Sequence, residues 1–161
     1  MAGKTPNASS DGLLASVCFK LASRALENTT DKSSEVPPKY CIKSLKLAAD
    51  RGHLLAMSQL GSLLLRQGAT RTDKRKGIEY LVSAAKRGDS EAQFELGRIY
   101  ELGLELYSKD ERMAVHWYAL AAEGGNKSAA RCLANAYRNG ELGVVKSGEK
   151  AEHWKEQVGN H

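Results

Sequence analysis

The sequence repeats itself with a period of 36 or 37 residues, and this repeat constrains the fold more than any other feature. The first half of each unit has an alanine, a leucine four residues later and a small residue directly after the leucine. The second half has an Ala-Ala pair, followed three residues later by a glycine. A period of this length is typical of arrays of stacked helix pairs. The matching positions are Ala56, Leu60 and Gly61, then Ala92, Leu96 and Gly97, then Ala129, Leu133 and Ala134, with closing glycines at Gly52, Gly88 and Gly125.

Each unit is predicted to form two helices. In the first helix, Ala92, Leu96 and Tyr100 lie at helical spacing and share one face. The second helix of the same unit is expected from Met113 to Ala122. Small residues in both helices allow close approach, which explains why 15 glycines occur in a chain that otherwise favours helix. The closing glycines suit the left-handed backbone that often ends a helix.

Polar residues mark the expected starts of the second helices. Asp73 and Asp110 lie between the two helices of their units and are predicted N-caps. Ser147 occupies the same position in the last unit. The basic run at residues 71–76 is then expected in the turn before the second helix of its unit, where its side chains are solvated.

The pattern A-x-x-x-L-G-x-x-Y, then an aspartate, then A-x-x-W-Y-x-x-A-A-x-x-G, resembles the Sel-one-like repeat (SLR) family, which is related to tetratricopeptide repeats. The resemblance covers about residues 39 to 158 and is best in the third unit. It implies an all-α fold, a right-handed α-solenoid (α/α superhelix) of about four helix-hairpin repeats. Family members commonly serve as scaffolds, so it also implies a non-catalytic adaptor that binds a protein or peptide.

The repeat divides the chain into segments. A degenerate first unit precedes the clear ones, and its helix is predicted from Gly12 to Glu27, with Asp11 as cap and Leu21 in the position of Leu60. The apolar side of that helix is expected to be buried. The expected segments are a flexible tail at 1–11, a degenerate first repeat at 12–51 with a polar loop at 28–39, repeats at 52–87 and 88–124, and a C-terminal capping repeat at 125–161.

Composition and charge narrow the class further. Hydrophobic residues are 42% and charged residues 27%, as in an ordinary soluble domain. No apolar run long enough for a membrane span and no secretory signal is visible, so we expect a cytoplasmic protein. The net charge is +5, but the basic residues are interspersed, which favours a protein partner over nucleic acid.

No sequence motif indicates catalysis. G-x-S-x-G, H-E-x-x-H, G-x-G-x-x-G and P-loop patterns are absent, so no catalytic residue, cofactor or metal site is predicted. Cys18, Cys41 and Cys132 do not recur with the period and form no C-x-x-C pair, which predicts buried free thiols. His116 and His153 occupy equivalent positions, which favours a surface or packing role over general-base chemistry.

Two other functions stay open as alternatives. One is a hydrolase like the cysteine-rich, penicillin-binding branch of the family, although that branch has paired cysteines in each repeat and this chain does not. The other is a basic repeat protein that binds nucleic acid, although aromatic residues are only 6% and fall mostly at expected core positions.

The outward side of the stacked first helices is the predicted binding site. On a helical wheel, Ala92, Leu96 and Tyr100 fall between about 0° and 80°, the buried side. Phe94 falls between about 200° and 300°, facing out, and is the predicted apolar anchor, with burial against a neighbouring unit as the alternative. The predicted polar contacts are Gln59, Ser62, Glu95, Arg98, Arg131, Asn135 and Arg138.

Overall fold

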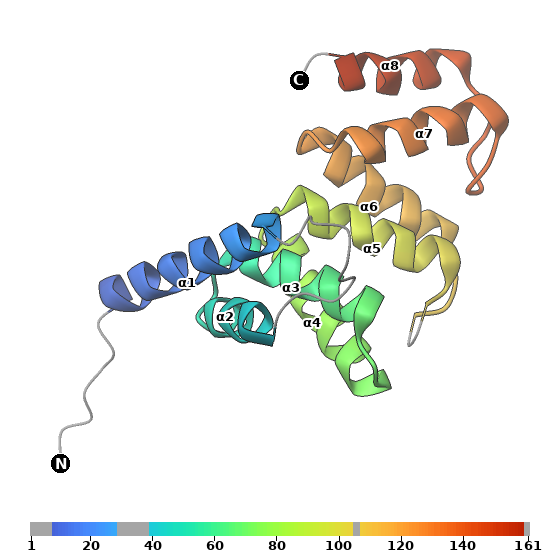
Figure 1. Cartoon of the computed structure of the whole chain (residues 1–161). Helices are drawn as coiled ribbons and strands as arrows, with labels where there is room; N and C mark the ends of the chain where they lie inside the picture. Colours follow the sequence, from blue (N-terminus) through green and yellow to red (C-terminus); the bar gives the residue numbers. More distant parts are fainter. Residues whose placement is uncertain (1–7, 29–38, 105–106, 160–161) are drawn as a thin grey trace.

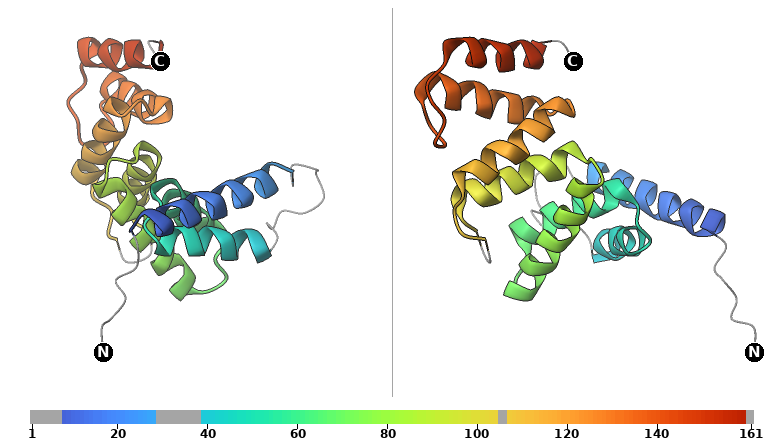
Figure 2. Two further views of the ribbon diagram at one scale, coloured as in Figure 1. Left: turned by 90° about the vertical axis from the view of Figure 1, so that its left-hand side faces the viewer. Right: turned by 180° about the vertical axis from the view of Figure 1, so that it is seen from behind.

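The computed structural model describes residues 8–28, 39–104 and 107–159, and in these ranges the chain forms eight α-helices and no strand. Consecutive helices pair into four hairpins that stack one after another (Figures 1 and 2). The predicted all-α solenoid is therefore confirmed. The helices are α1 (Ala8–Asn28), α2 (Lys39–Asp50), α3 (Leu54–Gln67), α4 (Arg71–Lys86), α5 (Ser90–Leu102), α6 (Glu111–Glu123), α7 (Lys127–Asn139) and α8 (Gly148–Gly159).

Equivalent polar residues start the first helices α3, α5 and α7. The side chains of His53, Asp89 and Asn126 each accept a hydrogen bond from the backbone N–H three residues later. A cap of this kind satisfies one of the unpaired donors at a helix start. A histidine, an aspartate and an asparagine side chain can each cap the helix, so this position of the repeat tolerates exchange among these residue types.

The second helices start with caps that agree only in part with the predictions. Asp110 caps α6, and the Ser147 hydroxyl accepts from the N–H of Lys150 at 3.3 Å, both as predicted. Asp73 is not the N-cap of α4: Thr70 is, and Asp73 stands three residues later in a reciprocal capping box with it. Because α4 begins this early, the basic run at 71–76 lies in its first turns and not in a turn between helices.

Small residues let the two helices of a hairpin touch. A Cβ atom at Gly97 would lie 2.4 Å from Cδ1 of Tyr118, so α5 and α6 meet at this glycine. In the preceding hairpin, a Cβ at Gly61 would lie 2.8 Å from the carbonyl oxygen of Gly77. Gly88, which ends its hairpin, has φ +90° and occupies the left-handed region as predicted.

Short apolar side chains fill the core, which is built from two clusters. One joins α1 to α5, and the other joins α6 to α7 with contributions from α5 and α8. The three cysteines are free thiols, as predicted, with Cys41 fully buried and Cys18 and Cys132 half-buried. No helix in the described ranges is long and apolar enough to span a bilayer.

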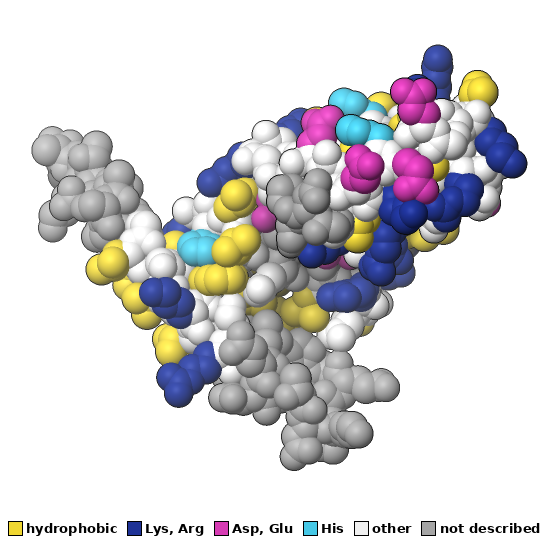
Figure 3. All heavy atoms as spheres, turned by 90° about the horizontal axis from the view of Figure 1, so that it is seen from above, with side chains coloured by type: hydrophobic (Ala, Val, Ile, Leu, Met, Phe, Trp, Pro, Cys, Tyr) yellow, Lys and Arg dark blue, Asp and Glu magenta, His cyan; other side chains and the backbone are white. Residues whose placement is uncertain are grey.

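Helix α1 departs from the prediction in its start and in its buried face. It begins at Ala8, so Asp11 is not its cap, and the last residues of the predicted tail are helical. Its buried positions include Ala15 and Ala22, whereas Leu21 is 62% exposed. Leu13, Leu14 and Val17 of this helix are exposed as well, and hydrophobic side chains are visible along it in Figure 3.

The reason for this difference is the number of neighbours. The first helices α3, α5 and α7 each pack against the preceding second helix and against their own partner, while α1 packs chiefly against α2. A narrow row of small residues is enough to form the contact with α2. The larger apolar residues of α1 lie outside this contact and stay exposed. Most of the predicted loop at 28–39 and residues 1–7 of the predicted tail lie outside the described residues.

Candidate functional site

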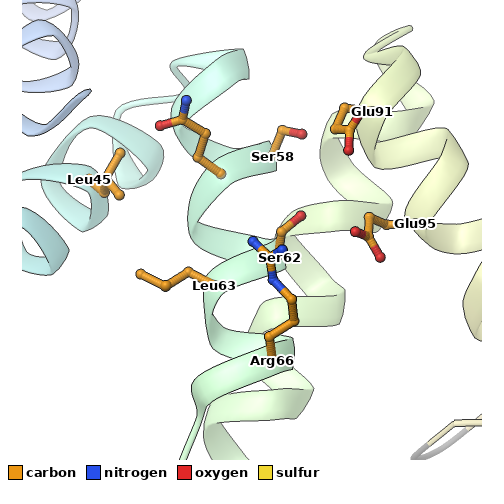
Figure 4. Close-up of a pocket in the computed structure, with 8 residues that line it drawn as sticks. Leu45, Ser58, Ser62, Leu63, Arg66, Glu91 and Glu95 are labelled. Carbon is orange, nitrogen blue, oxygen red and sulfur yellow. The ribbon is translucent and has the colours of Figure 1, made fainter. Parts of the chain in front are cut away.

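The outward side of α3, α5 and α7, which we call the first-helix face, is hollowed in two places. The first hollow, the α3–α5 cavity, has a volume of about 340 Å³ and is lined mainly by α3 and α5 (Figure 4). The second, the α5–α7 cavity, has a volume of about 700 Å³ and is lined by the C-terminal halves of α5 and α7, the start of α6 and the turn at 140–143. Cavities of this size are typical of ligand sites, so the face offers two places where partner side chains can insert.

Most of the predicted polar contacts are exposed on this face. Gln59 lines the α3–α5 cavity and Asn135 lines the α5–α7 cavity. Arg98 on α5 is exposed, and Arg131 and Arg138 are exposed on α7. All five side chains are therefore exposed, and they come from the first helices of three successive hairpins.

Phe94 does not face outward as predicted. Its ring is half-buried and tilted against the ring of Tyr118 on α6, with the two centroids 5.6 Å apart. Tyr118 belongs to the second helix of the same hairpin, so the contact lies within the unit of Phe94 and not against a neighbouring unit. Phe94 is a packing residue of the second core cluster and does not stand free as an anchor.

Glu95 and Ser62 also differ from the wheel, since they are only 7% and 8% exposed. The wheel treated a first helix as having one buried side. In the stack that helix contacts its own partner, the preceding second helix and, between α3 and α5, the neighbouring first helix. The buried arc is therefore wider than about 80°, and residues at its edge become the inner walls of a cavity.

Five residues that line the α3–α5 cavity are not among the predicted contacts: Leu45, Ser58, Leu63, Arg66 and Glu91. Leu45 comes from α2 of the preceding hairpin, and no pattern within a single helix indicates that contact. Arg66 stands one turn after Ser62 and two turns after Ser58, so a helical wheel of α3 would have placed it on the same side. All eight residues that line this cavity are drawn in Figure 4.

Carboxylates make the α5 side of the α3–α5 cavity acidic. Glu91 Oε2 accepts a hydrogen bond from Asn126 Nδ2 at 2.9 Å. Burial raises the pKa of Glu91, as do the nearby Glu95 and Asp89 carboxylates, against the opposing effects of Asn126 and Arg66. A raised pKa shows that the surroundings disfavour further negative charge at this position.

The α5–α7 cavity shows no arrangement that favours a nucleophile. Burial raises the pKa of the Cys132 thiol, and the Glu101 carboxylate raises it further. Glu101 itself accepts a hydrogen bond from the Tyr118 hydroxyl. A thiol held protonated is a weak nucleophile. Within the described ranges, no group of three or more His, Cys, Asp or Glu residues is placed to hold a metal ion.

Stacked hairpins with an open, hollowed face define the class of α-solenoid repeat proteins. Within this class the chain belongs to the Sel1 repeat family. The family model, described as Sel1 repeat, matches residues 54–89, 90–126 and 128–156, which together make up more than half of the chain. The resemblance seen in the sequence is thereby confirmed.

Similar proteins of known name share only this part of their length. The mouse protein DAP3-binding cell death enhancer 1 is 33% identical over 121 residues, covering 73% of this chain and 23% of that protein. The Saccharomyces cerevisiae chitin synthase regulator SKT5 is 34% identical over 126 residues, covering 73% of this chain and 18% of that protein. The chain thus spans about a fifth of the length of these relatives.

Solved structures have the same architecture. A Sel1 repeat protein from Oxalobacter formigenes superposes with a TM-score of 0.74 at 27% identity, covering 89% of this chain and 57% of that one. The antigen c5321 of uropathogenic Escherichia coli, described as an SLR fold, also gives 0.74, at 22% identity, covering 96% of this chain and 33% of that one. These likenesses support the right-handed α-solenoid predicted from the sequence.

Proposed function

We propose that this protein is a non-catalytic adaptor that binds a segment of a partner protein on the first-helix face. The proposal is carried by exposed polar side chains on the first helices of three successive hairpins, of which Gln59 and Asn135 line the two cavities. Stacked repeats of this kind use such extended surfaces for binding. The names of two relatives, a DAP3-binding protein and a chitin synthase regulator, describe action on another protein and agree with this role.

The chemistry of the face favours a protein segment over nucleic acid. One feature would suit nucleic acid: Lys and Arg side chains gather along one side of the molecule in Figure 3, and a polyanion requires such a basic surface. Binding of single strands also needs exposed aromatic rings for base stacking. Phe94 and Tyr118 are instead packed against each other, so this face offers polar contacts and cavities without a stacking platform.

The proposal is tested by selecting binders from an unbiased library of 12-residue peptides and measuring their affinity by fluorescence anisotropy. An Arg131→Glu, Arg138→Glu double variant alters the first-helix face at exposed positions of α7. The matched control, Arg75→Glu, Arg112→Glu, makes the same charge change at exposed positions of the second helices α4 and α6.

We expect selected peptides to bind the control like the native chain and the first-helix variant at least about tenfold more weakly, because charges at an interface affect both encounter and dissociation. The proposal fails if no peptide is enriched. It also fails if both double variants bind the peptides equally.

A further inference from the structure

The inner wall of the α3–α5 cavity contains a carboxylate with an unused acceptor. Glu95 is 7% exposed, and its Oε2 accepts one hydrogen bond, from Arg98 Nη1 at 3.3 Å. The Arg98 side chain is 46% exposed, so its guanidinium lies mostly on the solvent side of this pair. No other donor among the described side chains reaches Glu95. A buried carboxylate has about four acceptor positions, so Glu95 has room for a further donor on its cavity side.

Ser62 supplies a second unused polar group in the same cavity. It is 8% exposed, and its hydroxyl has no hydrogen-bond partner within the described part of the chain. Ser58, one turn earlier, differs because its hydroxyl donates to Asp89 Oδ1 at 2.7 Å. Figure 4 shows Ser62 on α3 across from Glu91 and Glu95 on α5. The Ser62 oxygen is unpaired among the described residues and is not fully buried, so a ligand atom in the cavity can reach it.

Charge at the cavity indicates which ligand would fit. Glu91 adds a second carboxylate, whose one hydrogen bond in the described structure comes from the neutral amide of Asn126. Arg66 stands on the α3 side, yet it forms no ion pair with Glu91 or Glu95 in the described structure. Apart from the Arg66 guanidinium, the free groups of the cavity are therefore mainly acceptors, which suit a ligand rich in donors.

We propose that the α3–α5 cavity binds an arginine side chain of the partner segment, with its guanidinium between Glu95, Ser62 and Glu91. A guanidinium has five donors and no acceptor, and its planar fork suits carboxylate oxygens. The cavity volume of about 340 Å³ accommodates one such side chain. This inference rests on the proposed function, because it assigns one residue type of the partner to one part of the first-helix face.

The first experiment uses a small probe. The full ¹⁵N-labelled chain is titrated with N-acetyl-arginine amide, and N-acetyl-citrulline amide serves as a neutral control of nearly the same shape. We expect saturable shifts of the Ser62, Glu91 and Glu95 amides with a Kd in the range of about 1–10 mM, as for a single side chain. Citrulline should bind at least about tenfold more weakly. Equal binding of the two probes would overturn the proposal.

Variants identify the groups that hold the probe. Glu95→Gln and Glu91→Gln should each weaken binding of the arginine probe, by about tenfold or more at the buried Glu95. Arg66→Gln should strengthen it, because a competing positive charge is removed. Glu123→Gln makes the same charge change at an exposed position of α6 and should have no effect.

Two results contradict the assignment. One is unchanged binding of the arginine probe to folded Glu91→Gln protein. This variant keeps the assignment testable even if Glu95→Gln does not fold. The other is weaker binding of the probe in Arg66→Gln.

The peptide selection separates this inference from the proposed function. We expect selected peptides to share an arginine whose replacement by citrulline weakens binding to the native chain but not to Glu95→Gln. Peptides that require Arg131 and Arg138 yet share no arginine would refute the arginine site and leave the adaptor proposal standing. Absence of any peptide binder would refute the adaptor proposal, whatever the small probe does.

Discussion

At the residue scale, small side chains decide how closely two helices approach. Gly97 faces the ring of Tyr118, which is fully buried and whose hydroxyl is hydrogen-bonded to Glu101. The ring lies against Gly97 and Phe94 and is hydrogen-bonded at its tip, so it has little room to move aside for a methyl group. Glycine in a helix interior costs about 1 kcal/mol relative to alanine, and the helix contact explains why it is retained here.

Replacing Gly97 by alanine should therefore destabilise the protein, by about 1–3 kcal/mol, because the new Cβ would lie 2.4 Å from a ring carbon. Urea unfolding followed by circular dichroism measures the change. Gly148→Ala is the control, since a Cβ there meets nothing within 4 Å and stability should stay the same or rise slightly. A Gly97→Ala variant as stable as the native chain would show that the hairpin can repack.

A second prediction at this scale concerns His53. Its Nδ1 accepts the hydrogen bond that caps α3, its ring stacks on Phe19, and burial together with Arg87 lowers its pKa below the ordinary 6.5. At His53 the unfolded chain then binds a proton more readily than the folded chain. The neutral His53 therefore contributes its full stabilisation above pH 6.5, and this stabilisation is lost as the pH decreases from 6.5 towards the pKa of the folded state.

Asparagine performs the same capping at the equivalent Asn126, so His53→Asn should keep the helix cap and remove part of the loss of stability below pH 6.5. Urea midpoints measured between about pH 5 and 8 test this, a range that brackets the titration of histidine. His116→Asn, at an exposed position of α6, should leave the pH profile unchanged. If the His53→Asn profile is parallel to that of the native chain, His53 is not the group responsible.

At the element scale, helical spacing predicts which residues share a side but not which side becomes buried. In α1 the apolar residues do share one side, yet Leu21 is 62% exposed and Ala22 only 1%. Spacing also placed Phe94 and Glu95 on the outside of α5, where Phe94 instead packs on Tyr118 of α6 and Glu95 is buried in a cavity wall. Burial depends on the position of the next hairpin, and that information lies 30 or more residues away in the chain.

The exposed row of α1 leads to a third prediction. Leu21→Ala should change the free energy of unfolding by no more than about 0.5 kcal/mol, since the side chain is mostly in solvent. Ala22→Leu should cost about 1–3 kcal/mol, because the added atoms must enter a closed contact with α2. Both are measured by urea unfolding. A loss above about 2 kcal/mol for Leu21→Ala would mean that this leucine packs against another surface in solution.

At the scale of the whole molecule, each hairpin depends on its neighbours. The two core clusters meet at α5, which contributes Leu96 to the first and is flanked on both sides by other hairpins. The outer helices α1 and α8 each have neighbours on one side only within the structure. Stability in such a stack is close to a sum of unit and interface terms, so it is uneven along the chain.

Hydrogen exchange should show this unevenness. We expect the amides of α4 and α5 to exchange slowest and those of α1 and α8 fastest, because terminal helices open without breaking two interfaces. Mass spectrometry of peptides after deuterium labelling measures these rates. Uniform protection from α1 to α8 would indicate that the four hairpins unfold as one cooperative unit.

The sequence by itself determined the helix pairs, their number and the glycines at their contacts and ends, because these depend on local spacing that recurs with the repeat. It also indicated the first-helix face, and the exposed positions of Gln59, Arg98, Arg131, Asn135 and Arg138 agree with it. Only the tertiary structure packed Phe94 against the second core cluster and turned Glu95 and Ser62 into the inner walls of a cavity. The physical reason is that a cavity is made by side chains from different hairpins, and its shape and charge follow from how those hairpins stack.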